Sequence, residues 1–323
     1  MILILTDKEE PTSDLIIGWL LRMQKPFYRI SVADVLEFNK VYMNPETKTI
    51  EIIFSFVRNG ETITIDTKDI TSYWYRRSIL SKKFKEINYG PYHEEVSDIL
   101  NGYKKEEHLE LIKYLNYVLD KKAKLNSDID NEVIKFQSLD LALKVGLEIP
   151  STLVTTKKSD LLEFVKAGND KIITKPIGNP FSFVNHGMYQ FTSLVELDRV
   201  PEQFELSQVQ KAIDKKFELR IFYFNLKFYS SAVMSQANEK TKIDVKNYDD
   251  NNPNRIVPYL LPAEIENKLR RLMNLLNLKS GSIDMIVDKN DKFIFLEVNP
   301  IGQFEQVANP CNYDLYYLIA DHL

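Results

Sequence analysis

The feature that most constrains the fold is a pair of short apolar runs near the carboxyl end, in GSIDMIVDKNDKFIFLEVNP, residues 281–300. Asn290-Asp291 between the runs tolerates a two-residue turn and predicts a β-hairpin. With that turn, Asp284 lies directly opposite Glu297, because residues on the two strands then pair one to one. Asn299 shares the face of Glu297, since side chains two apart on a strand point the same way. Pro300 then ends the strand. The hairpin therefore brings two carboxylates and one carboxamide together.

These three oxygen donors predict a metal site. Hard oxygen ligands with room for phosphate oxygens suit Mg²⁺. Two acids at this spacing would repel each other without a cation. The alternative is a surface hairpin with ordinary polar positions. We expect Asp284, Glu297 and Asn299 to bind Mg²⁺.

A second strand, KKFELRIFYF at residues 215–224, carries charge on one face. Glu218, Arg220 and Phe222 share that face, while Leu219 and Ile221 take the other. Arg220 can hold a phosphate or a developing acyl-phosphate through its planar guanidinium group. The alternative is an internal Glu–Arg pair on a solvated face.

Several further residues are candidates for nucleotide binding. Lys175 ends the apolar strand KIITKPI, where a lysine can reach phosphates as a point charge, and Lys135 lies on a helix of the same unit. The strand QVQKAI ends at 213, and the backbone of Lys211, Ala212 and Ile213 can recognise an adenine edge, with Asp214 near a ribose. No Walker A loop or Rossmann glycine fingerprint is present in the sequence, so a nucleotide would bind in some other way.

The stretch YWYRR places Arg76 and Arg77 at the end of a strand in the amino-terminal region. Ligands of open α/β sheets gather beyond the carboxyl ends of the strands. These arginines can bind a substrate carboxylate or merely a structural acid, and the sequence leaves both open.

Composition excludes several classes of protein. A net charge of −4 over 323 residues gives no basic field for nucleic acid. One cysteine, Cys311, excludes an internal disulfide and suits a reducing compartment. The first residues, MILILTD, have no basic segment and predict a buried strand, not a signal peptide. No stretch is long and apolar enough to span a membrane. We therefore expect a cytoplasmic protein.

The order of elements predicts a mixed α/β (α+β) chain of three domains. Residues 1–125 alternate strands and helices, with a hairpin at Asn59-Gly60, which predicts a parallel core with an antiparallel appendage. Residues 126–206 form a central domain, opened by a helix that Gly146 closes. Residues 207–323 form an antiparallel domain that carries the predicted Mg²⁺ hairpin and a helix over 263–277.

Taken together, these segments resemble the ATP-grasp superfamily over nearly the whole chain. The matching segments, in order, are IKFQSLDLALKVGLEIPSTLVT, IITKP, QKAIDKKFELRIFYF and GSIDMIVDKNDKFIFLEVNPIGQF. The resemblance implies an amino-terminal pre-ATP-grasp domain, a central domain and a carboxyl-terminal ATP-binding domain. It implies that Asp284, Glu297 and Asn299 bind the Mg²⁺ of ATP. It also assigns two nucleotide lysines, a hinge and a phosphate-side arginine, which are Lys135 and Lys175, Gln210–Ile213, and Arg220. Glu218 is a further candidate for binding the nucleotide.

Within the superfamily, the chain looks most like the peptide maturases that make graspetides, particularly the grasp-with-spasm type. The features are WYRR, FELRIFYF, and FLEVNPIGQF followed by NPCNYDLYYLIADHL. The resemblance implies that ATP phosphorylates a Glu or Asp side chain of a precursor peptide. A Thr, Ser or Lys side chain of that peptide then displaces phosphate and closes an ω-ester or ω-amide ring. Lys175 and Arg220 would assist catalysis, and Arg76, Arg77, Lys246 and Arg255 are candidates for reading acidic residues of the peptide.

The resemblance also bears on partners. It implies a precursor peptide with a leader and a core rich in acids and threonine, a SPASM-type protein of the same pathway, and a homodimer. Two other functions stay open. One is an ATP-grasp ligase that adds a free amino acid to a protein or small molecule, and the other is a catalytically dead peptide-binding member.

Overall fold

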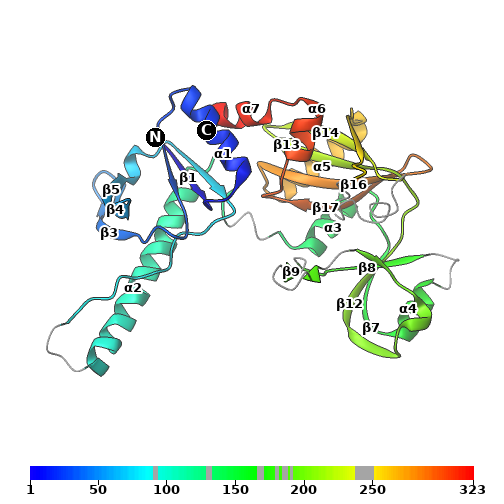
Figure 1. The fold of residues 1–323 in the computed structure, drawn as a ribbon, viewed down its shortest axis with the longest axis horizontal. Coiled ribbons are helices and arrows are strands. Elements are labelled where there is room, and N and C mark those ends of the chain that lie inside the picture. The colour runs from blue at the N-terminus through cyan, green and yellow to red at the C-terminus, as the bar shows by residue number, and fades with distance from the viewer. Residues whose placement is uncertain are drawn as a thin grey trace. The chain divides into compact units, whose positions relative to one another are not determined.

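The structure, a computed structural model, describes residues 1–89, 94–128, 133–165, 171–178, 182–183, 188–189, 192–236 and 251–323. The chain divides into two compact units (Figure 1). Unit 1 comprises residues Met1–Glu132 and Asp314–Leu323, and unit 2 comprises Val133–Tyr313. The predicted boundary between the second and third domains lies within unit 2 and stays a prediction.

Unit 1 is built on a parallel sheet in the order β2-β1-β6, with strands Phe27–Ile30, Ile2–Thr6 and Ser72–Arg76. Every residue of β1 and β6 is buried, as expected for strands covered on both faces. Helix α1 (Pro11–Arg22) packs against α7 (Leu315–His322), where the rings of Trp19 and Tyr317 meet edge to face at 5.4 Å. The amino-terminal cap of α1 is Glu10, whose carboxylate accepts a hydrogen bond from the Ser13 amide. Pro11 occupies the first helical position, which proline favours.

The appendage of unit 1 is a three-stranded antiparallel sheet, β3-β4-β5, with strands Glu37–Asn44, Thr49–Arg58 and Glu61–Asp66. A short 3-10 turn, Thr67–Asp69, leads from it to β6. The Asn59-Gly60 turn is confirmed, and both residues have positive φ. Unit 1 also contains helix α2 (Glu94–Asp120), whose His108 packs edge-on against Phe38 of β3, with the ring centroids 5.6 Å apart.

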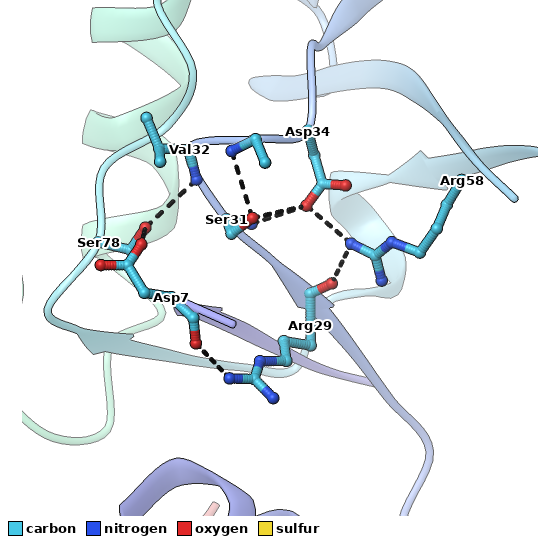
Figure 2. A network of polar contacts seen from close by, with 8 residues as sticks. Asp7, Arg29, Ser31, Val32, Asp34, Arg58 and Ser78 are labelled. Atoms are coloured by element: carbon cyan, nitrogen blue, oxygen red, sulfur yellow. Dashed lines mark hydrogen bonds and ion pairs between the residues drawn. The ribbon is translucent and has the colours of Figure 1, made fainter. Parts of the chain in front are cut away.

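A polar network ties the two sheets of unit 1 together at the carboxyl ends of the parallel strands (Figure 2). Arg58, which ends β4, donates to the Asp34 carboxylate at 2.7 Å and to the Arg29 carbonyl at 2.8 Å. Asp34 also accepts from the Ser31 amide at 2.8 Å, and Ser78 donates to Asp7 at 2.8 Å. The parallel core and the antiparallel appendage are therefore linked by charge-assisted hydrogen bonds.

Unit 2 contains a four-stranded sheet in the order β11-β8-β12-β7. Its strands are Ser193–Leu194, Ile172–Lys175, Gln203–Lys211 and Thr152–Lys157, and helix α4 (Lys158–Val165) follows β7. One face of this sheet buries Val209 and Ile172 against Leu161 of α4. The opposite face carries Lys175, Gln208 and Gln210, because Gln208 pairs with Lys175 and side chains alternate along each strand. A short 3-10 turn (Leu197–Arg199) and a two-stranded pairing of β9 (Ser182–Phe183) with β10 (Met188–Tyr189) complete this region.

The second sheet of unit 2 has five strands in the order β15-β14-β13-β16-β17. They are Arg255–Pro258, Lys227–Met234, Lys215–Phe224, Ser280–Asp288 and Phe293–Asn299. One face packs against helices α3 (Lys135–Lys144) and α5 (Ala263–Leu275), with Leu219, Ile221 and Ile283 in the core (Figure 1). On the other face, Phe304, which precedes α6 (Glu305–Cys311), packs against Phe222 with the two rings tilted and their centroids 4.5 Å apart. This second face carries the charged residues of the candidate site.

The hairpin of β16 and β17 reaches the predicted register by a different route. The turn holds three residues instead of two: the Asp288 amide donates to the Lys292 carbonyl, and Asp291 has a φ of 61°. That change shifts the pairing by one residue near the turn. A bulge between Asp284 and Met285, where Leu296 is the extra residue of β17, restores it. Asp284 therefore lies opposite Glu297, as predicted.

No helix in the described parts of the chain is both long enough and apolar enough to cross a lipid bilayer.

Candidate active site

The candidate site is centred on a row of charged residues that crosses three neighbouring strands. Arg220 of β13 pairs with Asp284 of β16, which in turn pairs with Glu297 of β17. All three side chains therefore lie on the face opposite α3 and α5. Arg220 Nη1 forms an ion pair with Asp284, and the two side chains are only 15% and 14% exposed.

Charge in this row holds Arg220 in its cationic form. Burial lowers the pKa of Arg220, but the Asp284 and Glu218 carboxylates outweigh burial and raise it above its ordinary value. Arg220 Nε is buried without a hydrogen-bond partner among the described residues. A buried, unsatisfied donor on a permanent cation is suited to an anionic oxygen such as that of a phosphate.

Lys135, the first residue of α3, reaches the same row from the helix. Its Nζ lies 3.8 Å from Glu297 Oε2 and donates to the Gly178 carbonyl at 2.7 Å. Gly178 follows β8, the strand that ends in Lys175. Lys135 therefore connects the acidic pair of the five-stranded sheet with the segment beyond Lys175.

The predicted metal trio consists of two facing carboxylates and one amide. Asn299 lies at the exposed end of β17, and its Oδ1 accepts from the Ile301 amide at 3.1 Å. Across the described ranges, no group of three or more His, Cys, Asp and Glu side chains is arranged to hold a metal. Two facing carboxylates on one sheet face nevertheless fit a Mg²⁺ ion whose remaining ligands are phosphate oxygens and water. The residues present thus suit Mg²⁺ bound together with a nucleotide.

Glu218 lies on the same face of β13 as Arg220, two residues before it. Its Oε1 forms an ion pair with Lys215, and both side chains are almost fully buried. Burial raises the pKa of Glu218 above its ordinary value, although Lys215 and Arg220 act in the opposite direction.

The four-stranded sheet presents the other nucleotide candidates. Lys175 is half-buried at the end of β8, and Gln210 is buried on the same face. Gln210 Nε2 donates to the Thr152 hydroxyl at 2.8 Å. The sheet therefore offers one cation and a fixed carboxamide on a single face.

The predicted hinge can offer one free amide. The amides of Lys211 and Ala212 already donate to the Ser151 and Lys171 carbonyls, at 3.1 and 2.8 Å. Among the described residues, the Ile213 amide has no such bond, so it is the hinge donor open to a ligand. Asp214, which follows, forms an exposed ion pair with Lys289 at 2.7 Å.

The described candidates for substrate binding belong to both units. Arg76 is buried in unit 1, where its Nη2 lies 3.1 Å from Glu10 Oε1, so it forms an ion pair with a structural acid. Arg77 is exposed with a φ of 54°, and Arg255 is exposed at the start of β15. Lys246 lies outside the described residues. Peptide binding by these four residues stays a prediction.

Lys215 is a further charged residue on the site face, and the sequence pattern does not predict its position there. Simple alternation puts Lys215 on the core face, because it lies three residues before Glu218. A bulge between Lys215 and Phe217 reverses that expectation. The sequence carries no clear signal of this bulge.

Comparisons with known proteins give the fold. No protein-family model and no curated protein matches the chain. A RiPP-associated ATP-grasp ligase from Chryseobacterium gregarium, in complex with ADP and a leader and core peptide, superposes with a TM-score of 0.75 at 24% identity. The alignment covers 99% of this chain and 95% of that chain.

The chain has the ATP-grasp fold. Macrocyclase MdnC from Microcystis aeruginosa MRC, bound with precursor peptide MdnA, is similar at 23% identity and a TM-score of 0.73, over 99% and 98% of the two chains. ATP-grasp ligase PsnB, complexed with minimal precursor, Mg and ADP, is similar at 14% identity and a TM-score of 0.65, over 99% and 95%. The predicted α/β (α+β) class with an ATP-grasp architecture is confirmed.

Proposed function

We propose that the protein is an ATP-dependent, ADP-forming ligase that closes rings in a ribosomal precursor peptide. The observation that carries the proposal is the row formed by Arg220, Asp284 and Glu297 on one face of the five-stranded sheet. It occurs within a fold shared, over nearly the full length, with ATP-grasp ligases described in complex with ADP or with precursor peptides.

The chemistry requires activation of a carboxylate, whose oxide is a very poor leaving group. A Glu or Asp oxygen of the peptide attacks the γ-phosphorus of ATP, ADP departs, and an acyl-phosphate forms. A Thr or Ser hydroxyl, or a Lys amine, of the same peptide then attacks the acyl carbon. Phosphate leaves with the former carboxylate oxygen, and the nucleophile loses its proton to solvent. The sum is ATP consumed, ADP and phosphate formed, and one water lost from the peptide for each ester or amide ring.

Residues of this chain supply positioning and charge. Mg²⁺ bound at Asp284, Glu297 and Asn299 would neutralise phosphate charge. Arg220 presents its unsatisfied Nε to an anionic oxygen, and Lys135 and Lys175 add further cations. Phosphoryl transfer depends mainly on such positioning and electrostatic stabilisation.

The nucleotide would be held by the remaining candidates. The Ile213 amide and the Lys211 carbonyl suit an adenine edge, and Glu218 suits the ribose. Gln210 and Ala212 shape the hinge, and Asp214 stands beside it. Binding of the peptide in one orientation places its hydroxyl or amine against the acyl-phosphate. It also excludes water, which would otherwise hydrolyse the acyl-phosphate.

We further propose the partners of the reaction. A precursor peptide with a leader and an acidic, Thr-rich core would be the substrate, read by Arg77, Arg255 or Lys246. A SPASM-type protein of the same pathway and a homodimer are to be tested by co-purification and light scattering. Because the reaction consumes ATP, we place it in the cytoplasm.

Mass spectrometry of candidate acidic, Thr-rich peptides, incubated with the protein, ATP and Mg²⁺, tests this function. Loss of water from a peptide only when ATP is present supports a ring-forming ligase. A gain of one amino-acid mass with added free amino acids indicates an amino-acid ligase instead. No ADP formation with any peptide contradicts both and leaves a peptide-binding protein.

A further inference from the structure

The start of strand β13 contains a bulge that turns a lysine onto the site face. Lys215 pairs with Asp288 and Phe217 pairs with Val287, so Lys216 is an extra residue on β13. A bulge changes which face the residues before it occupy. Lys215 therefore lies on the face of Glu218 and Arg220, although it is an odd number of residues from both.

The ion pair formed there is unusual in its burial. Lys215 and Glu218 side chains are 4% and 9% exposed, whereas the next lysine, Lys216, pairs with Asp291 at 51% and 69% exposure. Removing two charges from water is costly, so a buried pair is weak evidence for added stability. A buried pair on a binding face is better explained by what it does for a ligand.

The pair leaves one carboxylate oxygen available. Lys215 Nζ engages Glu218 Oε1, and Oε2 takes part in no hydrogen bond with a described residue. Burial alone would raise the pKa of Glu218 and favour its neutral form, and the nearby lysine opposes this. A carboxyl group with one oxygen fixed by a lysine and one open can accept hydrogen bonds from neutral hydroxyl groups.

We propose that Lys215 is a positioning residue for the nucleotide: it holds the Glu218 carboxyl group in one orientation, so that the open oxygen binds the ribose hydroxyls of a ribonucleotide. The proposal rests on the proposed function, in which Glu218 contacts the ribose. It predicts that the preference for a ribonucleotide over its 2′-deoxy counterpart depends on Lys215, a residue that does not itself contact the nucleotide.

Binding of ADP and of 2′-deoxy-ADP, each with Mg²⁺, is measured by isothermal titration calorimetry for one control variant and five other proteins. The five are the wild type, Lys215→Met, Lys215→Arg, Glu218→Gln, and the Lys215→Met/Glu218→Gln double variant. Lys216→Met is the matched control, because it removes the neighbouring lysine from an exposed pair. The double variant carries no unpaired buried charge, which protects folding if Lys215→Met alone is unstable.

We expect Lys215→Met to weaken ADP binding about tenfold or more, as for loss of a charge-assisted hydrogen bond, and to reduce the preference for ADP over 2′-deoxy-ADP. Lys215→Arg should restore much of both, Lys216→Met should change neither, and the double variant should match Glu218→Gln alone. If folded Lys215→Met, or the double variant, prefers ADP over 2′-deoxy-ADP as strongly as the wild type does, this inference is wrong and the proposed function still stands. Absence of ADP binding by the wild type overturns both.

Discussion

Replacing Arg220 with methionine tests how the acidic pair is held when no nucleotide is bound. Arg220 forms an ion pair with Asp284, and Asp284 in turn faces Glu297 across the sheet. Without the guanidinium group, two facing carboxylates remain on a largely buried face. Among the described residues, Lys135 is a cation that stays nearby, since its Nζ lies 3.8 Å from Glu297 Oε2.

The size of the effect follows from the burial of the pair. Breaking a fully buried ion pair by removing one partner costs about 3–5 kcal/mol. The Arg220 and Asp284 side chains retain 15% and 14% exposure, and Lys135 still offsets part of the charge. We therefore expect Arg220→Met to lower the free energy of unfolding by about 2–3 kcal/mol. Arg199→Met, which breaks an exposed pair with Glu196, should cost about 0–1 kcal/mol.

Urea denaturation with and without MgCl₂, at constant ionic strength, measures the loss of unfolding free energy in Arg220→Met and its recovery when Mg²⁺ binds. In the wild type, Mg²⁺ must compete with Arg220 for Asp284, so its stabilising effect should be small. In Arg220→Met the guanidinium group no longer competes for Asp284, and saturation with Mg²⁺ at a hundred times the dissociation constant adds about 2.7 kcal/mol. Equal effects of Mg²⁺ on both proteins, or an undiminished stability of Arg220→Met, would refute the reasoning.

Three further predictions concern stability and can be checked by calorimetry or urea denaturation. Gly302→Ala should lower the free energy of unfolding by about 1–3 kcal/mol, because the added Cβ would clash with the Cβ of Ser282, and Ser282→Gly in the same chain should recover it. Leu226→Gly should gain about 1 kcal/mol, because Leu226 has a φ of 62°. Burial lowers the pKa of His108, so the wild type should lose stability as the pH falls below 6.5, and His108→Leu should lose less over the same range. A stable Gly302→Ala, a destabilised Leu226→Gly or parallel pH profiles would contradict these expectations.

The acidic pair could be found from sequence because hydrophobic alternation fixes strand register more firmly than turn type does. The expected two-residue turn at Asn290-Asp291 is wrong, and a bulge at Leu296 compensates for the longer turn. Burying the apolar face of the hairpin requires Ile283 and Val298 on the core side, and that requirement places Asp284 opposite Glu297.

Other features depended on partners that are distant in sequence. Arg76 was correctly placed at the end of a strand, but its partner Glu10 lies 66 residues away, so the sequence could not choose between a substrate and a structural acid. The amino-terminal cap of α1 is Glu10, a residue type that is uncommon at this position. Pro11 was the available signal, since proline favours the first helical position.

The sheet face that Lys215 occupies could not be predicted from the sequence pattern. Its position depends on one extra residue in β13, which changes the face that the lysine occupies. Alternation rules assume an unbroken ladder and therefore assign it to the core face. Burial of the Lys215–Glu218 pair became visible only once the register of three strands was known.

The central claim is that ATP activates a side-chain carboxylate of a bound peptide through an acyl-phosphate. Its most direct test uses a substrate peptide whose Glu and Asp carboxylates carry ¹⁸O, incubated with the protein, ATP and Mg²⁺. Phosphate released with ring closure is then analysed by mass spectrometry. The account predicts one ¹⁸O atom in the phosphate for each ring closed. Unlabelled phosphate released alongside a peptide that has lost water would contradict it.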